Sequence, residues 1–206
     1  LSIKSLNLNS AATGFARLNW ARAFDFNGDG TKDLLNPGAA LPTPADLTVD
    51  FAASLQMKVT GSVEGTASVT YGSGPSAVTV TGVLLSAGPV AIAGSAEFAL
   101  TRQTADVDTD ASGTPDLLGA TVDEVALRLT GAHVYVDGVA DLTVSGALAV
   151  ARVTPSGAGA TARYTALKMG DVIVTVRAQP AGDFGLTGTL SIKSLNLNSA
   201  ATGFAR

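Results

Sequence analysis

The sequence predicts an all-β protein whose long, bent, mainly antiparallel strands form a sandwich or a flattened barrel in two pseudo-repeats. Three observations lead to this prediction: polar and apolar residues alternate over long stretches, glycines recur inside those stretches, and the composition suits strands. Hydrophobic residues make up 46% of the 206-residue chain but aromatic residues only 5%, and there are 23 glycines. Small and β-branched apolar residues with many glycines favour strands joined by tight turns.

The clearest strand signal lies at residues 55–71. Every odd position there is apolar or glycine, and every even position is polar. A period of two indicates a half-buried antiparallel strand, or a hairpin whose turn preserves the alternation.

A glycine recurs on the apolar face of five alternating segments. They are Val59-x-Gly61-x-Val63, Ile92-x-Gly94-x-Ala96, Leu129-x-Gly131-x-His133, Val144-x-Gly146-x-Leu148 and Leu186-x-Gly188-x-Leu190. Glycine weakens a strand interior, so its recurrence predicts sharp bends or close backbone approaches in long strands. The alternatives are hairpin turns between short strands, or a β-solenoid whose rungs break at the glycines.

An exact duplication joins the two ends of the chain. Residues 1–17, LSIKSLNLNSAATGFAR, return unchanged as residues 190–206. We interpret residues 1–17 as overlap with the end of a preceding repeat and residues 18–206 as one 189-residue tandem repeat. An engineered redundant end is the alternative, and it also implies a repeating parent protein.

A fainter repeat divides the period into two related halves. Residues 25–35 align with residues 108–118 at an offset of 83, and each segment precedes alternating stretches. The sequence therefore predicts pseudo-halves at roughly 25–107 and 108–206, each an acidic loop followed by strands.

The first acidic loop has the spacing of a calcium-binding loop. Oxygen-bearing side chains occupy positions 1, 3, 5 and 9, glycine occupies position 6, and the carbonyl of position 7 adds a further oxygen. The candidate ligands are Asp25, Asn27, Asp29, Thr31 and Asp33. The alternative is an acidic turn that lies in water.

The second acidic loop keeps the same frame with a serine in place of the third acid. Its candidate ligands are Asp108, Asp110, Ser112, Thr114 and Asp116. We expect weaker Ca²⁺ binding here, with Asp106 either compensating for the missing acid or repelling its neighbours.

The segment FDFNGDGTKDLL resembles the calcium loops of dockerins, thrombospondin type 3 repeats and the FG-GAP/VCBS repeats of bacterial surface proteins. The resemblance covers the loop alone, so it implies the ion and not the fold. Position 12 is Asn36 in one loop and Gly119 in the other, where an EF-hand has a bidentate glutamate.

The pattern of the whole chain is similar to giant tandem-repeat proteins of the bacterial cell surface, such as RTX-type adhesins. The resemblance implies a secreted, extracellular protein whose repeats extend an adhesive tip and stiffen when Ca²⁺ binds.

Composition argues against several other functions. The net charge is −4, and without one copy of the duplicated segment it is about −6, so nucleic acid is not an expected partner. Membrane insertion is not expected, because the apolar runs are too short for a spanning helix. The chain has no cysteine and one histidine, His133, which we expect to pack in a strand, and we predict no enzymatic activity.

The function expected from the sequence is structural: a filament-forming or spacer repeat of a cell-surface stalk, stiffened by Ca²⁺. Its expected partners are neighbouring identical repeats in the same or adjacent chains. One unit is expected to offer one slot for LSIKSLNLN, so that the spare copy adds to a neighbour's sheet. The alternative is an adhesin module that binds glycans or surfaces through Trp20, although Trp20 is expected to pack beside the first loop. Asp123 and Glu124 are expected in a solvated turn.

Overall fold

The computed structural model describes residues 1–157, 159–177 and 188–201. Nine strands and three short 3-10 helices, η1 to η3, occur in this part of the chain. The strands are β1 (Ser2–Leu8), β2 (Leu55–Glu64), β3 (Ala67–Tyr71), β4 (Val78–Ala87), β5 (Val90–Val107), β6 (Leu117–Val136), β7 (Ala140–Thr154), β8 (Tyr164–Arg177) and β9 (Thr189–Ala200). The helices are η1 (Trp20–Arg22), η2 (Pro37–Ala40) and η3 (Gly74–Ser76).

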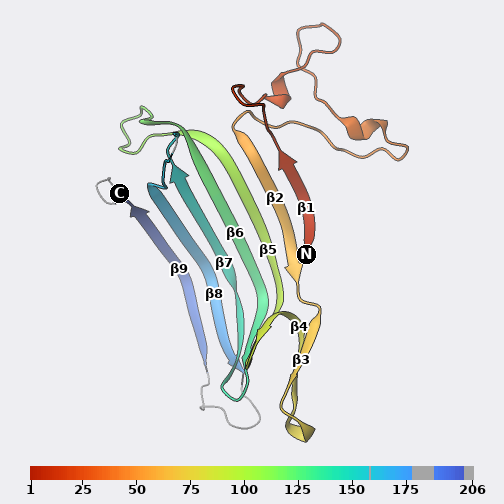
Figure 1. Cartoon of the computed structure of the whole chain (residues 1–206), viewed down its shortest axis with the longest axis vertical. Coiled ribbons are helices and arrows are strands. Elements are labelled where there is room, and N and C mark those ends of the chain that lie inside the picture. The colour runs from red at the N-terminus through yellow and green to blue at the C-terminus, as the bar shows by residue number, and fades with distance from the viewer. Residues whose placement is uncertain (158, 178–187, 202–206) are drawn as a thin grey trace.

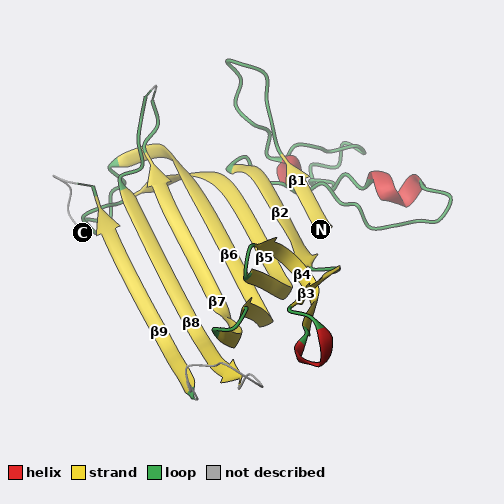
Figure 2. Ribbon diagram, turned by 60° about the horizontal axis from the view of Figure 1, so that its bottom comes forward, coloured by secondary structure: helices red, strands yellow, loops and turns green. Residues whose placement is uncertain are grey.

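All nine strands belong to one antiparallel sheet, which confirms the all-β prediction (Figure 1). Its main path runs β1-β2-β5-β6-β7-β8-β9, with β1 and β9 at opposite edges. Strands β3 and β4 form a hairpin off this path, joined to it through β4 and β5 (Figure 2).

The prediction of a sandwich or flattened barrel is wrong, because the sheet is a single open layer (Figure 2). Each strand from β5 to β8 pairs with the strand that follows it, and the β6–β7 connection is only Asp137–Val139. A connection as short as this one places the next strand beside the last one, and all nine described strands lie in the same sheet. The β-solenoid alternative is wrong as well, because β5 and β6 run antiparallel over 18 and 20 residues.

The predicted bends are confirmed at three of the recurring glycines. Gly94 in β5, Gly131 in β6 and Gly146 in β7 have φ angles of 115°, 62° and 149°, and the pairing register shifts beside each. These are bulges, which bend long strands without ending them. The strands curve together across the sheet in Figure 1.

The remaining two glycine segments behave differently. Gly61 lies in β2 where a Cβ atom would come within 2.3 Å of the Ser2 carbonyl oxygen, so it permits a close approach of β1. Gly188 directly precedes β9 with a φ angle of 151°, and Leu186 lies outside the described residues.

The alternating stretch at residues 55–71 forms two strands, β2 and β3, and not one strand or one hairpin. The chain leaves the β2 ladder at Gly65, whose N–H donates to the Gly94 carbonyl. Beyond it, β3 pairs with β4 and not with β2.

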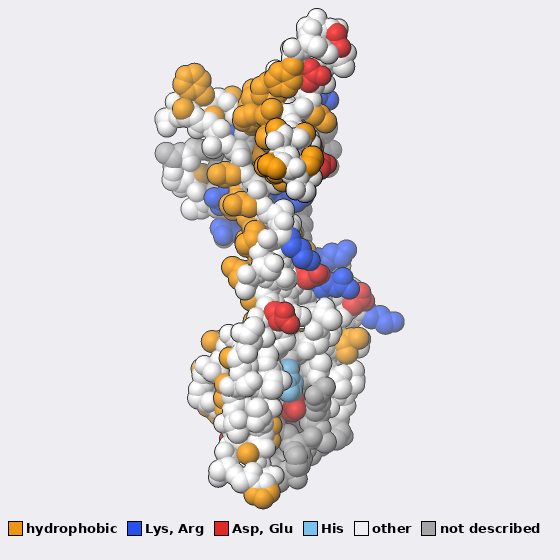
Figure 3. All heavy atoms as spheres, turned by 90° about the vertical axis from the view of Figure 1, so that its right-hand side faces the viewer, with side chains coloured by type: hydrophobic (Ala, Val, Ile, Leu, Met, Phe, Trp, Pro, Cys, Tyr) orange, Lys and Arg blue, Asp and Glu red, His pale blue; other side chains and the backbone are white. Residues whose placement is uncertain are grey.

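The two faces of the sheet differ in chemistry, because residues paired across neighbouring strands point to the same side. One cross-strand row is aliphatic from edge to edge: Leu6, Val59, Leu100, Val125, Val150, Leu167 and Leu197. The adjacent row on the other face is polar or small: Ser5, Thr60, Ala99, Ala126, Ala149, Lys168 and Asn196. Figure 3 shows the thin edge-on profile, with hydrophobic side chains along one border and a mid-height group of charged side chains at the other.

The main buried cluster lies where the β3–β4 hairpin joins β5 and β6. Its members are Tyr71, Val80, Val83, Ala91, Ala93 and Tyr135. The rings of Tyr71 and Tyr135 lie 5.1 Å apart, and Tyr135 is 1% exposed. The hairpin thus supplies local cover that most of the sheet lacks.

Candidate metal centres

Both acidic loops lie at the same end of the sheet (Figure 1). The first belongs to the segment between β1 and β2, and the second joins β5 to β6. Strands β1 and β5 run in the same direction, because each is the antiparallel partner of β2. Both strands therefore finish at this end of the sheet.

The first loop is held by hydrogen bonds from its backbone to its own acids. Asp25 accepts from the N–H groups of Gly28 and Gly30 at 2.8 and 3.0 Å. Asp33 closes the loop by accepting from the Phe26 N–H at 2.7 Å. The Asp33 N–H in turn donates to the Phe24 carbonyl at 2.9 Å.

The second loop repeats this arrangement. Asp108 accepts from the Gly113 N–H at 2.7 Å, and Asp116 accepts from the Thr109 N–H at 3.2 Å. The Asp116 N–H donates to the Val107 carbonyl at 3.0 Å. Three hydrogen bonds therefore connect equivalent positions in both loops. The N–H of position 6 donates to the aspartate at position 1, and the N–H of position 2 donates to the aspartate at position 9. The N–H of position 9 donates to the carbonyl of the residue before position 1.

The backbone torsions of the loops also correspond. At position 6, Gly30 and Gly113 have φ angles of 84° and 88°. At position 4, Gly28 has a φ angle of 74°, whereas its counterpart Ala111 has 59°. A left-handed alanine costs roughly 1 kcal/mol of conformational free energy, so this turn is less favourable in the second loop than in the first, where glycine occupies the position.

Hydrogen bonding favours the charged form of one acid in each loop. The backbone N–H of Thr31 is the main reason that the pKa of Asp29 lies below its ordinary value of 3.8. Hydrogen bonds from Ser112 lower the pKa of Asp110 in the same way. Both groups stay ionised at neutral pH, as ligands of a hard cation must.

The carboxylates gather more closely in the second loop than the missing third acid would suggest. Oxygen atoms of Asp108, Asp110 and Asp116 lie within 4.8 Å of one another. Asp106 lies outside this group and accepts from the Gly119 N–H at 2.7 Å. It therefore fastens the base of the loop, a role that the sequence analysis did not anticipate.

Position 12 of each loop is used for structure. The Asn36 side chain accepts from the Leu47 N–H at 3.0 Å, and Gly119 donates to Asp106. The donor sets of both loops nonetheless consist of oxygen atoms only, on side chains that are exposed or half-buried at the surface, so the residues present fit a calcium ion.

A buried asparagine anchors the first loop to the sheet. Asn9 is 3% exposed, donates to the carbonyls of Leu18 and Ala52, and accepts from the Trp20 indole N–H at 3.0 Å. The Trp20 ring packs against Phe24, just before the loop, at 5.8 Å. Trp20 thus packs beside the loop as expected. Sequence reasoning missed Asn9, whose only signal was its position at the end of an alternating strand.

The single histidine is part of the sheet. His133 lies half-buried in β6 and contacts Asp141 of β7 through Nε2, near the end of β6 that is opposite to the second acidic loop. The placement of Asp123 and Glu124 in a turn is wrong, because both lie inside β6. There Asp123 forms a two-point ion pair with Arg102 of β5, with N–O distances of 2.5 and 3.1 Å.

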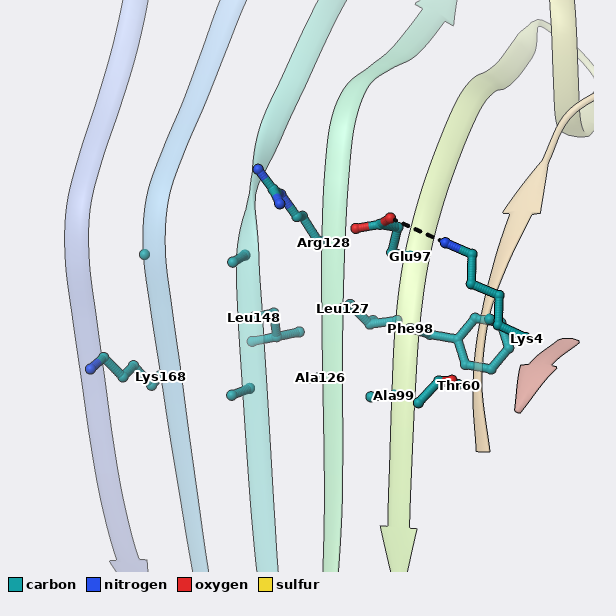
Figure 4. A pocket seen from close by; sticks show the side chains of 14 residues that line it. Lys4, Thr60, Glu97, Phe98, Ala99, Ala126, Leu127, Arg128, Leu148 and Lys168 are labelled. Atoms are coloured by element: carbon teal, nitrogen blue, oxygen red, sulfur yellow. Dashed lines mark ion pairs between the residues drawn. The ribbon is translucent and has the colours of Figure 1, made fainter. Parts of the chain in front are cut away.

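A shallow groove of about 510 Å³ crosses the alanine-rich face at mid-sheet (Figure 4). Ala99, Ala126 and Ala149 line it, and the Lys4–Glu97 ion pair, with its charged atoms 3.8 Å apart, lies at one side. It is an open trough on a flat sheet, shaped by the small size of the alanine side chains.

Among the described residues, no helix is long and apolar enough to cross a bilayer. Comparison with models of protein families, with curated proteins and with solved structures finds no match for this chain.

Proposed function

We propose that this chain is a structural repeat of a long extracellular tandem-repeat protein, a calcium-stiffened stalk or filament segment at a cell surface. The observation that carries the proposal is the fate of the duplicated sequence. The first copy of LSIKSLNLN forms β1 (Ser2–Leu8) and the second copy lies within β9 (Thr189–Ala200), at opposite edges of one open sheet. An open sheet whose two ends have the same sequence is suited to repetition.

The acidic loops supply the proposed calcium sites. Asp25, Asn27, Asp29, Asp33 and the Thr31 carbonyl would hold one ion, and the equivalent residues of the second loop another. Bound Ca²⁺ would supply the positive charge that holds these carboxylates together. Two ions would bring +4 against a period charge of about −6, which removes most of the self-repulsion.

The extracellular assignment follows from the same loops. Extracellular modules bind Ca²⁺ in the range of about 10⁻⁴–10⁻³ M, and we expect these loops, with three aspartates each, to bind in that range. The ion would then be bound outside cells and would act as a constant structural component.

The test is thermal unfolding of the chain in millimolar Ca²⁺ and in chelator. We expect Ca²⁺ to raise the midpoint of unfolding by several degrees, since the ion binds the folded state. Asp29→Ala and Asp110→Ala should each reduce this rise. Asp50→Ala removes an equal charge outside the loops and should leave the rise intact. An equal calcium response in all four proteins would refute the calcium sites.

A second candidate function is a surface-binding module, favoured by the exposed aromatic ring next to the first loop. Phe26 is 65% exposed and stacks on Phe24 at 5.3 Å. Phe26→Ala is a sharper test than Trp20→Ala, because Trp20 also holds Asn9. Glycan-array binding by the chain that Phe26→Ala abolishes would favour this module over the spacer.

A further inference from the structure

We propose that the second copy of the duplicated segment is the first strand of the next period, shared between two periods. It would pair with β8 on one edge and with β2 of the following period on its other edge. The inference rests on the proposed tandem array and specifies how its units join. The array would be one continuous antiparallel sheet, and the partner of each outer edge would be another copy of the same period.

Strand direction satisfies the first requirement. A shared strand must run in the same direction in both of its roles. The path from β1 to β9 contains six antiparallel pairings, so β9 has the direction of β1 (Figure 1). An odd number of pairings would have reversed β9 and excluded it as a partner of the next β2.

The hydrogen-bonding edges satisfy the second requirement. In an antiparallel strand, alternate residues direct their N–H and C=O groups to opposite neighbours. The Asn9 N–H donates to the Gln56 carbonyl, so the regular pairing from Ser5 onward directs Asn9 and Asn7 toward β2. Leu6 and Leu8 therefore direct their backbone groups toward the free edge.

In the second copy, the other set of alternate residues bonds to the neighbouring strand. The Ala201 N–H donates to the Arg163 carbonyl, and the pairing with β8 is regular from Ala200 back to Ser194. Leu197 and Leu195, the copies of Leu8 and Leu6, therefore bond to β8. Asn196 and Asn198, the copies of Asn7 and Asn9, direct their backbone groups outward. Each copy thus uses the edge that the other leaves free.

The side-chain faces satisfy the third requirement. The aliphatic row that starts at Leu6 ends at Leu197, which is the copy of Leu8. The offset across one period is thus two residues along the strand. An even offset keeps the aliphatic face on the same side, whereas an odd offset would turn it over at every junction.

Both copies interrupt their regular pairing at the same lysine. The register between β1 and β2 shifts across Lys4. The β8–β9 ladder omits its copy, Lys193, opposite Asp171, which has a φ angle of 51°. If one strand has both neighbours, its pairing with each of them must be interrupted at the same residue, as it is in these two copies.

The environment of one asparagine agrees with this assignment. Asn9 is buried by the segment that follows it, whereas its copy Asn198 is exposed. In the array, the following period's Trp20 would cover Asn198 as this chain's Trp20 covers Asn9. We therefore expect Asn198 to become buried in the array, where residues of the next period pack over it.

The first test is residue-resolved amide hydrogen exchange on the chain as it is. We expect slow exchange at Asn7 and Asn9 with fast exchange at Leu6 and Leu8. The second copy should show the reverse, with slow exchange at Leu195 and Leu197 and fast exchange at Asn196 and Asn198. The same alternation in both copies would overturn the proposal, because one strand could not then serve two neighbours.

The second test exposes the β8 edge in the full chain. L195P/L197P removes two N–H groups that bond to β8, so the freed edge should accept β1 of another molecule. We expect concentration-dependent oligomers in sedimentation velocity, whereas the unmodified chain stays monomeric. A strictly monomeric variant that retains its strand signal in circular dichroism would overturn the proposal.

The matched control places the same prolines in the first copy. L6P/L8P removes N–H groups at a free edge, where proline is tolerated, and should remain folded and monomeric. The quadruple variant has no copy able to pair with β8 and should not form these oligomers. Oligomers of equal size in the quadruple variant would show non-specific edge contact and overturn the proposal.

Failure here is distinguishable from failure of the proposed function. Strand pairing involves neither acidic loop, so the oligomers should form in both Ca²⁺ and chelator. A calcium-dependent rise in unfolding temperature without strand exchange would leave a stalk of separately folded units. If the proline variants do not fold, the exchange pattern of the unmodified chain still decides.

Discussion

Single residues in this protein acquire different roles from identical sequence surroundings. Asn9 and Asn198 have the same neighbours along the chain, LSIKSLNL before them and SAA after them. Asn9 is buried and its side chain makes three hydrogen bonds, while Asn198 is exposed at the outer edge. Only the packing of residues 10–54 against the first copy separates the two.

The two asparagines therefore give a matched pair of substitutions. Asn9→Ala leaves the Trp20 N–H and two backbone carbonyls without their partner, and should destabilise the chain by about 2–3 kcal/mol. Asn198→Ala removes an exposed side chain and should change stability by less than about 0.5 kcal/mol. Urea unfolding of both variants measures the difference, and equal losses would contradict the described packing.

A second residue-scale prediction concerns acid stability. A hydrogen bond from Arg102 is the main reason that the pKa of Asp123 lies below its ordinary value of 3.8. A lowered pKa in the folded state means that Asp123 stabilises the fold above about pH 3.8, and that this contribution disappears as the pH falls further. Asp123→Asn should therefore flatten the loss of stability below pH 4, measured by unfolding across that range.

The contribution is small, because the pair is partly exposed. The Arg102 and Asp123 side chains are 51% and 28% exposed, and such pairs contribute about 1 kcal/mol or less. An acid dependence in Asp123→Asn as steep as in the unmodified chain would assign it to other carboxylates, among them Asp29 and Asp110.

At the scale of elements, β5, β6 and β7 remain long because glycines inside them allow each strand to bend without ending. Gly94, Gly131 and Gly146 adopt left-handed torsions at register shifts, so that β5, β6 and β7 turn together without ending. Straight strands of this length would twist away from their neighbours. The glycines are therefore positions where sequence determines the shape of the sheet.

Gly146 offers the clearest test of this role. A Cβ atom there would lie 2.9 Å from the Val172 Cα, and the φ angle of 149° is unfavourable for other residues. Gly146→Ala should destabilise the chain by about 1–3 kcal/mol. Gly170→Ala, in the neighbouring strand, meets nothing within 4 Å and should be close to neutral. Equal melting temperatures for the two variants would contradict the bend.

At the scale of the whole molecule, the open sheet gives the proposed array a definite form. The strands would run across the array axis, with six pairings per 189-residue period. At about 4.8 Å per strand, each period would advance the array by roughly 29 Å. The strands span the width, so the array would be a ribbon whose width exceeds its rise per period.

This form predicts a diffraction pattern. Oriented samples of a chain with several periods should give a strong reflection at about 4.8 Å along the array axis, since that is the strand spacing. Separately folded units that rotate about linkers would not align their strands in this way. A 4.8 Å reflection perpendicular to the axis, or none, would contradict the continuous sheet.

Much of the local structure followed from the sequence. The period of two predicted antiparallel strands, and glycines that preserve the alternation predicted bends, because both properties depend on residues near in sequence. The acidic loops share three hydrogen bonds, each donated by a backbone N–H and two of them accepted by aspartate side chains, because their glycines and aspartates occupy the same positions. The duplication predicted that LSIKSLNLN forms a strand in both copies, but the expectation of one slot per unit is wrong, because β1 and β9 lie at opposite edges of the same sheet.

Tertiary structure alone decided the partners of those strands. Alternation shows that a strand has two faces, but it does not say what covers them, so the sequence could not separate a sandwich from a single open sheet. The charged pair Asp123-Glu124 resembles a turn in sequence, yet β6 is continuous there and Asp123 pairs with Arg102 of the neighbouring strand β5. Likewise, LSIKSLNLN contains both hydrogen-bonding edges of one strand, and the neighbours β2 and β8 determine which edge each copy uses.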